Sequence, residues 1–150
     1  MPGGHGPMTQ ITAELTSGTQ VTLSNGRHTW RADEPPEAQG NDTGPTPYEL
    51  LVGSLAACTL ITLALYCRHK SIPLKAVTAT YEHGRIHAKD CEDCEDVKSG
   101  FLDQITSRVR IAGSFDEAQR KRLTQIVGRC PVHKTLENGV RMVDEVEFAS

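Results

Sequence analysis

One apolar stretch constrains the fold of this chain more than any other. Residues 47–70 read PYELLVGSLAACTLITLALYCRHK, and the eighteen residues from Leu50 to Cys67 carry no formal charge. The helix that they predict is apolar on every face, so it is either deeply buried or embedded in a membrane. Its length just reaches that of a membrane span. Three features favour the core helix of a soluble, cytoplasmic domain over a membrane span. The stretch contains Gly53, Ser54 and two threonines, no signal peptide is evident, and the sequence on both sides is strand-like.

This helix also predicts that the chain associates with a second copy. The 150 residues suit a single domain over 1–150 with one core, in which the Gly- and Pro-rich residues 1–8 are disordered. A domain of this size has little material to cover a helix on all sides, so we expect a homodimer. The face predicted by helical spacing consists of Leu51, Leu55, Cys58, Thr62 and Leu65.

The remaining elements predict an α+β fold in which helices pack on one face of an antiparallel sheet. Alternation and turn signals predict a three-stranded meander at 10–16, 20–23 and 27–32, followed by a loop at 33–46. Thr46 is a candidate cap for the long helix. Further strands are predicted at 77–81, 105–111 and 140–148, with a polar excursion at 83–100 between the first two. A helix begins at a capping box of Ser114 and Glu117 and ends at Cys130, and a short helical turn spans 132–137.

Charge and cysteine content narrow the classes of partner. The net charge is −3 with mixed signs, so neither a nucleic acid nor a membrane surface is an expected partner. Five cysteines, an odd number, indicate thiols kept reduced in the cytosol rather than a structural disulfide framework.

Two of these thiols, Cys58 and Cys130, allow two interpretations. Cys58 lies in the middle of the long helix, and Cys130 directly precedes Pro131, where a helix N-terminus with His133 nearby favours an anion. Free cysteine is often simple core filler. If folding brings the two Cα atoms within about 7 Å, Cys58 can instead attack a peroxide and Cys130 can resolve the resulting sulfenic acid to a disulfide.

Two separated motifs carry a family resemblance. GPTPYELLVGSLAACT, followed much later by RCPVHKTLE, resembles the paired signature of the osmotically induced protein C and organic hydroperoxide resistance (OsmC/Ohr) family. DTGPTPYELL and HAKDCEDCE resemble a branch of it with a Cys-x-x-Cys insert. The resemblance implies an OsmC-like fold, an intertwined homodimer with its site at the subunit interface, Cys58 as peroxidatic thiol and Cys130 as resolving thiol.

The chain departs from the peroxidase branches of that family at one position. They place a glutamate ten residues before the peroxidatic cysteine, where this chain has Tyr48; Glu49 lies nine residues before, on the opposite side of a regular helix. The family also has an arginine that activates the peroxidatic thiol. No motif identifies it in this chain, and Arg27 and Arg31 are candidates.

A second cysteine pattern lies in the polar excursion. His87, Cys91 and Cys94 form H-x-x-x-C-x-x-C, spacing that suits zinc if His83 or Glu95 supplies a fourth ligand. The surrounding carboxylates raise thiol pKa values and disfavour a redox role. The alternative is an exposed acidic loop.

These observations together predict a cytoplasmic, homodimeric peroxidase that reduces organic hydroperoxides and is recycled by a dithiol reductant. No cofactor is expected in this reading. Two other functions stay open: a binding protein that holds an apolar or thiol ligand at the dimer interface without turnover, and a zinc-binding module at His87, Cys91 and Cys94.

Overall fold

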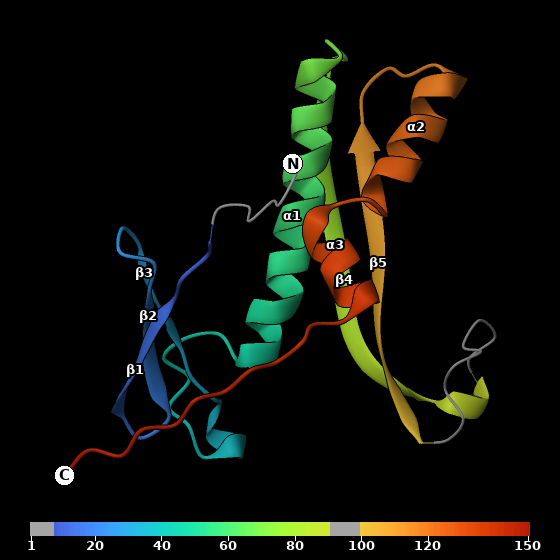
Figure 1. Ribbon diagram of the computed structural model, residues 1–150. Coiled ribbons are helices and arrows are strands. Elements are labelled where there is room, and N and C mark those ends of the chain that lie inside the picture. The colour runs from blue at the N-terminus through green and yellow to red at the C-terminus, as the bar shows by residue number, and fades with distance from the viewer. Residues whose placement is uncertain (1–7, 91–99) are drawn as a thin grey trace. The chain divides into compact units, whose positions relative to one another are not determined.

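The computed structural model describes residues 8–90 and 100–150, and it confirms an α+β fold (Figure 1). The predicted disorder of residues 1–8 therefore falls outside the described residues, except at Met8. The chain divides into two compact units, Met1–Leu51 and Val52–Ser150.

The first unit begins with the predicted antiparallel meander. Strands β1 (Thr12–Ser17), β2 (Gln20–Ser24) and β3 (Thr29–Ala32) pair in the order β1-β2-β3. Both turns contain a glycine with a positive φ, Gly18 at 55° and Gly26 at 93°. Glycine adopts this conformation without the steric cost that other residues bear, so the meander is confirmed together with the reason for its turns.

The loop at 33–46 is tied down by a buried carboxylate. Asp33 is only 2% exposed, and it accepts hydrogen bonds from the hydroxyls of Thr19 and Thr43 and from two backbone N–H groups. The hydroxyls of Thr19 and Thr43 are the main reason that the pKa of Asp33 lies far below its usual value. The loop, expected to be irregular throughout, also contains a short 3-10 helix, η1 (Pro36–Ala38). It delivers the chain in a fixed conformation to the long helix.

The long helix α1 (Pro47–His69) starts at a reciprocal cap. The Thr46 hydroxyl accepts the Glu49 N–H at 3.2 Å, and the Glu49 carboxylate accepts the Thr46 N–H at 2.9 Å. This is a capping box, in which two helix-end donors are satisfied at once. The two hydrogen bonds from Thr46 lower the pKa of Glu49. Thr46 is thus confirmed as the cap, and Glu49 shares that task.

The second unit pairs two long strands. β4 (Ala76–His87) and β5 (Phe101–Ala112) form an antiparallel hairpin with an uninterrupted register. β4 extends into the predicted polar excursion as far as His87, so the end of this strand, predicted at residue 81, was wrong; β5 begins at Phe101, directly after the excursion. The polar side chains there pair across the strands, which hides the alternation that marks a half-buried strand. A 3-10 helix, η2 (Ala88–Asp90), follows β4.

Two shorter helices complete this unit. The helix α2 (Glu117–Val127) is capped by Asp116 and Gln119 in a capping box, so the predicted box of Ser114 and Glu117 was wrong. Both patterns fit the sequence rule, but Phe115 packs against the core and the helix starts after it. The helix α3 (Pro131–Asn138) follows at the predicted break.

The core of the second unit selects a different face of α1 from the predicted one. The buried residues of α1 are Leu55, Thr59, Leu63 and Cys67, at a spacing of four. Leu65, which was assigned to the buried face, is 53% exposed. On a helix that is apolar all round, contacts with other elements decide the buried face, because spacing cannot. The central cluster and its partly buried neighbours comprise Leu63, Cys67, Leu123 and Ile126, with Tyr66, Ile72, Leu74, Val77, Val109, Ile111, Phe115 and Val127.

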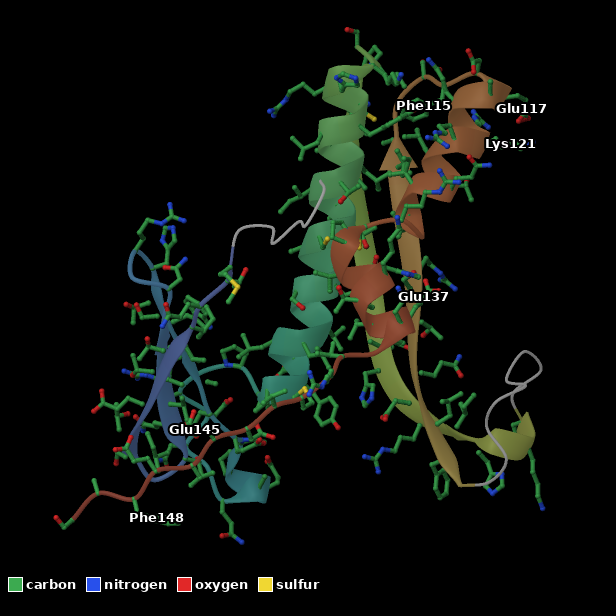
Figure 2. The ribbon with its side chains drawn as sticks, in the orientation of Figure 1. Phe115, Glu117, Lys121, Glu137, Glu145 and Phe148 are labelled. Atoms are coloured by element: carbon green, nitrogen blue, oxygen red, sulfur yellow. The ribbon has the colours of Figure 1, made fainter. Side chains whose placement is uncertain are left out.

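The C-terminal residues 139–150 form no strand, which corrects the prediction of a strand over 140–148. This segment follows α3 and carries exposed apolar side chains. Figure 2 labels two of its residues, Glu145 and Phe148. Val146 and Phe148 are 74% and 93% exposed. A strand needs a neighbour for its backbone hydrogen bonds, and no strand in the described part of the chain pairs with this segment.

By length and composition α1 could cross a membrane, although the core helix of a soluble protein meets the same criteria. Only 22% of its most apolar stretch is buried within this chain. The exposed apolar residues of α1 include Leu51, Ile61 and Leu65.

Candidate active site

The two cysteines singled out in the sequence meet where α3 begins beside α1 (Figure 1). Cys58 lies in the middle of α1, and Cys130 is the residue that caps α3. Both are free thiols, and the thiol of Cys58 is in hydrogen-bond contact with that of Cys130. Two residues from opposite halves of the chain are thus neighbours, close enough for one thiol to affect the pKa of the other.

Cys130 occupies a fully enclosed position. It is 0% exposed, and its sulfur accepts the N–H of His133 at 3.3 Å. The hydroxyl oxygen of Thr59 lies 3.6 Å from the same sulfur. Pro131 supplies the first residue of α3, where a missing N–H costs nothing because that group has no intrahelical partner. The local sequence therefore aims the free N–H groups of the helix start at sulfur.

Cys58 is the more accessible thiol of the pair, being half-buried. Burial raises its pKa, and the neighbouring Cys130 raises it further. The Val132 N–H, which donates a hydrogen bond to the sulfur, and the nearby hydroxyl of Thr62 act in the opposite direction and lower this pKa. None of the described contacts that shift this pKa involves a cationic side chain. Within one chain, then, the start of α3 is the main group that favours the thiolate.

The supporting residues proposed from the sequence lie in several places. Glu49 is engaged in the capping box of α1, and Tyr48 is 52% exposed in the same turn. Arg27 follows the β2–β3 turn and Arg31 lies on β3, both exposed in the first unit. Only His133 is beside the thiols in the second unit, through its backbone N–H, while its ring pairs with Glu137.

Three residues at this site were missed by the sequence analysis: Thr59, Thr62 and Val132. Thr59 and Thr62 each donate to the carbonyl four residues earlier in α1, at 3.1 Å and 2.7 Å. Threonine within a helix often bonds in this way, so the pattern carried no sign of chemistry. Val132 acts only through its backbone, which side-chain motifs cannot reveal.

The predicted zinc set is only partly within the described residues. His87 ends β4, where its Nδ1 accepts the Lys89 N–H at 3.2 Å and its ring meets Phe101 edge to face. Cys91, Cys94 and Glu95 lie outside the described residues. Across residues 8–90 and 100–150, no three His, Cys, Asp or Glu side chains are grouped as a metal site requires.

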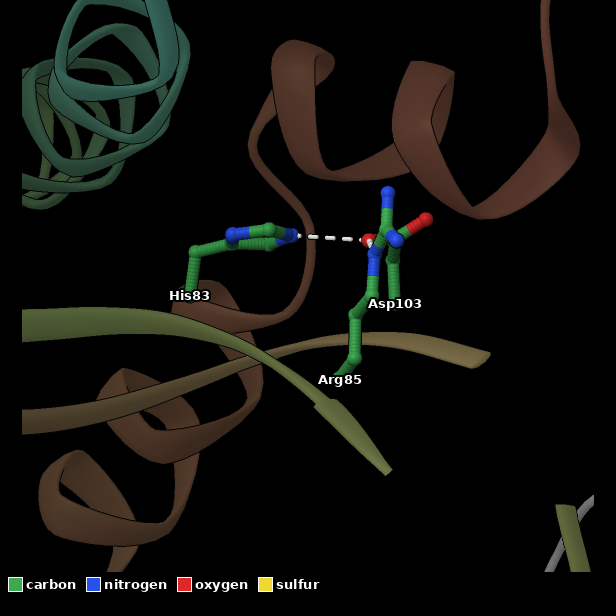
Figure 3. Close-up of polar contacts among 3 residues, drawn as sticks. All are labelled: His83, Arg85 and Asp103. Atoms are coloured by element: carbon green, nitrogen blue, oxygen red, sulfur yellow. Dashed lines mark hydrogen bonds and ion pairs between the residues drawn. The ribbon is translucent and has the colours of Figure 1, made fainter. Parts of the chain in front are cut away.

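His83, the other proposed zinc ligand, belongs to a polar cluster on the hairpin (Figure 3). Its Nε2 lies 2.9 Å from a carboxylate oxygen of Asp103, and Arg85 Nε lies 3.4 Å from the same oxygen. The hydrogen bond from His83, followed by that of Arg85, lowers the pKa of Asp103. This cluster joins β4 to β5 across the ladder, which is a structural role for all three side chains.

The sequence model of the family described as OsmC-like protein matches residues 40–143. A comparison with curated proteins gives no match. The matched range contains both thiols, both threonines and the start of α3.

Solved structures share the fold. An OsmC-like protein from Mycoplasma pneumoniae is 25% identical, with 87% of this chain and 88% of that chain covered and a TM-score of 0.67. The organic hydroperoxide resistance protein OsmC of Legionella pneumophila is 18% identical, with 87% and 89% covered and a TM-score of 0.60. The organic hydroperoxide resistance protein OhrB of Bacillus subtilis is 19% identical, with 85% and 89% covered and a TM-score of 0.56.

Proposed function

Because this chain belongs to the OsmC-like protein family, we propose that it is a thiol-dependent peroxidase that reduces organic hydroperoxides. The observation that carries the proposal is the contact between two free thiols of unequal exposure, Cys58 and Cys130. The similar proteins of Legionella pneumophila and Bacillus subtilis are named organic hydroperoxide resistance proteins, which agrees with the proposal. The aliphatic side chains of α1 favour a hydrophobic substrate over hydrogen peroxide.

The proposed reaction has three steps. The Cys58 thiolate attacks the terminal oxygen of the hydroperoxide, the O–O bond breaks, and the alkoxide takes a proton to leave as an alcohol. Cys58 is now a sulfenic acid. The sulfur of Cys130 attacks the sulfur of Cys58, the S–O bond breaks, and water leaves. A cytosolic dithiol then reduces the Cys58–Cys130 disulfide by exchange and is itself oxidised.

Peptide mass spectrometry tests this proposal directly. The reduced protein should react with one equivalent of cumene hydroperoxide, lose these two free thiols and acquire a Cys58–Cys130 disulfide, because the two thiols are neighbours in the fold. A dithiol should restore both thiols. If the hydroperoxide is not consumed and no such disulfide appears, the peroxidase proposal is wrong.

The raised pKa of Cys58 favours a second candidate function. Burial and the neighbouring thiol favour the protonated, unreactive form of Cys58. A protein with that property could hold an apolar or thiol ligand between two copies of the chain without turnover. The two functions differ in how the thiol responds to pH and to peroxide.

We therefore predict how the rate of hydroperoxide reduction depends on pH. Below its pKa the ionised fraction of a thiol rises about tenfold for each pH unit. Since the pKa of Cys58 is raised, the second-order rate constant should rise at this slope between pH 6 and pH 8 without a plateau. Stopped-flow measurement of single-turnover oxidation gives the rate constant. A plateau near neutral pH would show that a cation outside the described contacts lowers the pKa. A rate near that of free cysteine would favour the binding protein.

We also propose that the chain works as a homodimer. The second copy would cover the exposed residues of α1 and pair with the C-terminal segment 139–150. Two observations support this assembly: the segment has apolar residues at alternating positions without a strand beside it, and the two-stranded sheet leaves one edge of β4 and one edge of β5 open. Open edges of this length are normally covered in native proteins.

A further inference from the structure

The hydroxyl of Thr59 is fully buried between the two halves of the site. Thr59 is 0% exposed on the core face of α1. A buried hydroxyl is expected to be hydrogen-bonded, because leaving it unpaired is costly. Two groups lie within reach of its oxygen, the carbonyl oxygen of Leu55 at 3.1 Å and the sulfur of Cys130 at 3.6 Å.

A hydroxyl has one hydrogen to donate, so these two contacts cannot both be donated by Thr59. When Cys130 is a thiol, its S–H can donate to the Thr59 oxygen while the Thr59 O–H donates to Leu55. When Cys130 is a thiolate, it has no hydrogen, and the Thr59 O–H can turn to the sulfur instead. The Leu55 carbonyl keeps its helix hydrogen bond in either state. One rotation about the C–O bond thus accommodates both forms of Cys130.

Because Cys130 is 0% exposed, a negative charge on its sulfur must be stabilised by hydrogen-bond donors of the protein and not by water. Its sulfur accepts the His133 N–H, whose direction is fixed by α3 and does not change with protonation. Among the described residues, the other donors within reach are the Cys58 thiol, which has become a sulfenic acid before resolution, and the Thr59 hydroxyl, which can rotate. A charge that develops on this sulfur is therefore met by one fixed and one adjustable hydrogen bond.

We propose that Thr59 is a positioning residue for the resolving step, holding the Cys130 sulfur and donating to it as it loses its proton. The inference rests on the proposed function, which assigns resolution to Cys130. In this step the Cys130 sulfur forms a bond to the Cys58 sulfur, and the S–O bond of the sulfenic acid breaks. The proton lost by Cys130 ends on the departing oxygen, which leaves as water. No other reactant is needed.

The test compares variants of Thr59 in the full chain. Thr59→Val keeps the shape and removes the hydroxyl, and Thr59→Ser restores it. Thr124→Val is the matched control, since Thr124 donates to the Arg120 carbonyl at 2.9 Å in the same way on exposed α2, away from the thiols. Thr59→Ala is the second variant if valine disturbs folding, which circular dichroism would reveal. Each variant is labelled with ¹³Cβ-cysteine, and the signal of Cys130 is assigned with Cys130→Ser.

The first readout needs no peroxide. In a Cys58→Ala background, which leaves no donor at position 58, the pH at which Cys130 is half ionised should be higher by about one unit in Thr59→Val, because a hydrogen bond to an ionised group is lost. Thr59→Ser should return the midpoint to its starting value, and Thr124→Val should leave it unchanged. A folded Thr59→Val or Thr59→Ala variant with an unchanged midpoint would overturn the inference, whether or not the protein is a peroxidase.

The second readout is the resolving step itself. After one equivalent of hydroperoxide, quenched-flow mass spectrometry follows the conversion of the Cys58 sulfenic acid to the disulfide. At pH 7 this conversion should be about tenfold slower in Thr59→Val, while formation of the sulfenic acid is less affected. Thr59→Ser should be within about twofold of the unchanged protein. Equal slowing of both steps would show a general structural effect and contradict the assignment. Absence of any sulfenic acid would instead refute the proposed function.

Discussion

Replacing Cys58 with serine is expected to abolish hydroperoxide reduction, with a loss on the order of 10³-fold or more. A serine hydroxyl is not ionised near neutral pH and attacks the O–O bond far more slowly than a thiolate. The Thr62 hydroxyl and the Val132 N–H would remain in place, since neither depends on the sulfur for its position. The measurement is the consumption of cumene hydroperoxide with a dithiol in excess.

Cys130→Ser is the matched variant, and it should lose a different step of the reaction from Cys58→Ser. One equivalent of hydroperoxide should still be consumed in the first turnover, because Cys58 is intact. The product should then be a long-lived Cys58 sulfenic acid that a dimedone reagent traps, and further turnover should depend on direct attack by the reductant. If Cys58→Ser retains activity while Cys130→Ser loses the first turnover, the two roles are reversed. If both variants match the unchanged protein, these thiols do not carry the reaction.

Local rules in the sequence predicted much of this fold. Asn25-Gly26 gave the turn before β3, Thr46 was the expected cap of α1, and Pro131 separated α2 from α3. Each depends on a few neighbouring residues, whose backbone geometry and hydrogen bonds are fixed locally. Elements defined in this way can be read from a single sequence.

The face that α1 buries could not be predicted in the same way. Its apolar residues lie on every side, so periodicity carries no direction. Contacts with α2 and with the hairpin select Leu63 and Cys67, which pack against Leu123 and Ile126. The length of β4 has a similar cause, because its polar end is held by partners on β5 that are distant in sequence. Such information exists only once the chain has folded.

The candidate site shows the same division between local and distant information. The helix start after Cys130 was evident from Pro131, whereas the proximity of Cys58 joins residues 72 positions apart, which the residues left open and the family resemblance favoured. Thr59 had no signal of its own, since a threonine bonded to the preceding turn is ordinary. Its interest comes from the sulfur that folding places beside it.

Removing residues 140–150 is expected to convert the proposed dimer to a monomer. The exposed apolar side chains there include Val140, Met142, Val146 and Phe148, and burying each against a second copy contributes about 2 kcal/mol. α3 should be intact in this variant, because Gly139 is retained and its N–H donates to the Thr135 carbonyl. Sedimentation velocity measures the mass of each species in solution. A truncated chain that is still a dimer would assign the interface to α1 alone.

Substitutions on the two faces of residues 140–150 test whether this segment joins the dimer as an ordered strand or only through unspecific apolar contacts. In a strand, Val146 and Phe148 point to one face and Glu145 and Glu147 to the other. Val146→Asn with Phe148→Asn should therefore weaken the dimer by at least about 100-fold, because about 3 kcal/mol or more of burial is lost. Glu145→Asn with Glu147→Asn introduces the same side chains on the opposite face and should leave the dimer intact. Equal weakening by both pairs would contradict an ordered strand, and the segment would then act only as a flexible apolar contact.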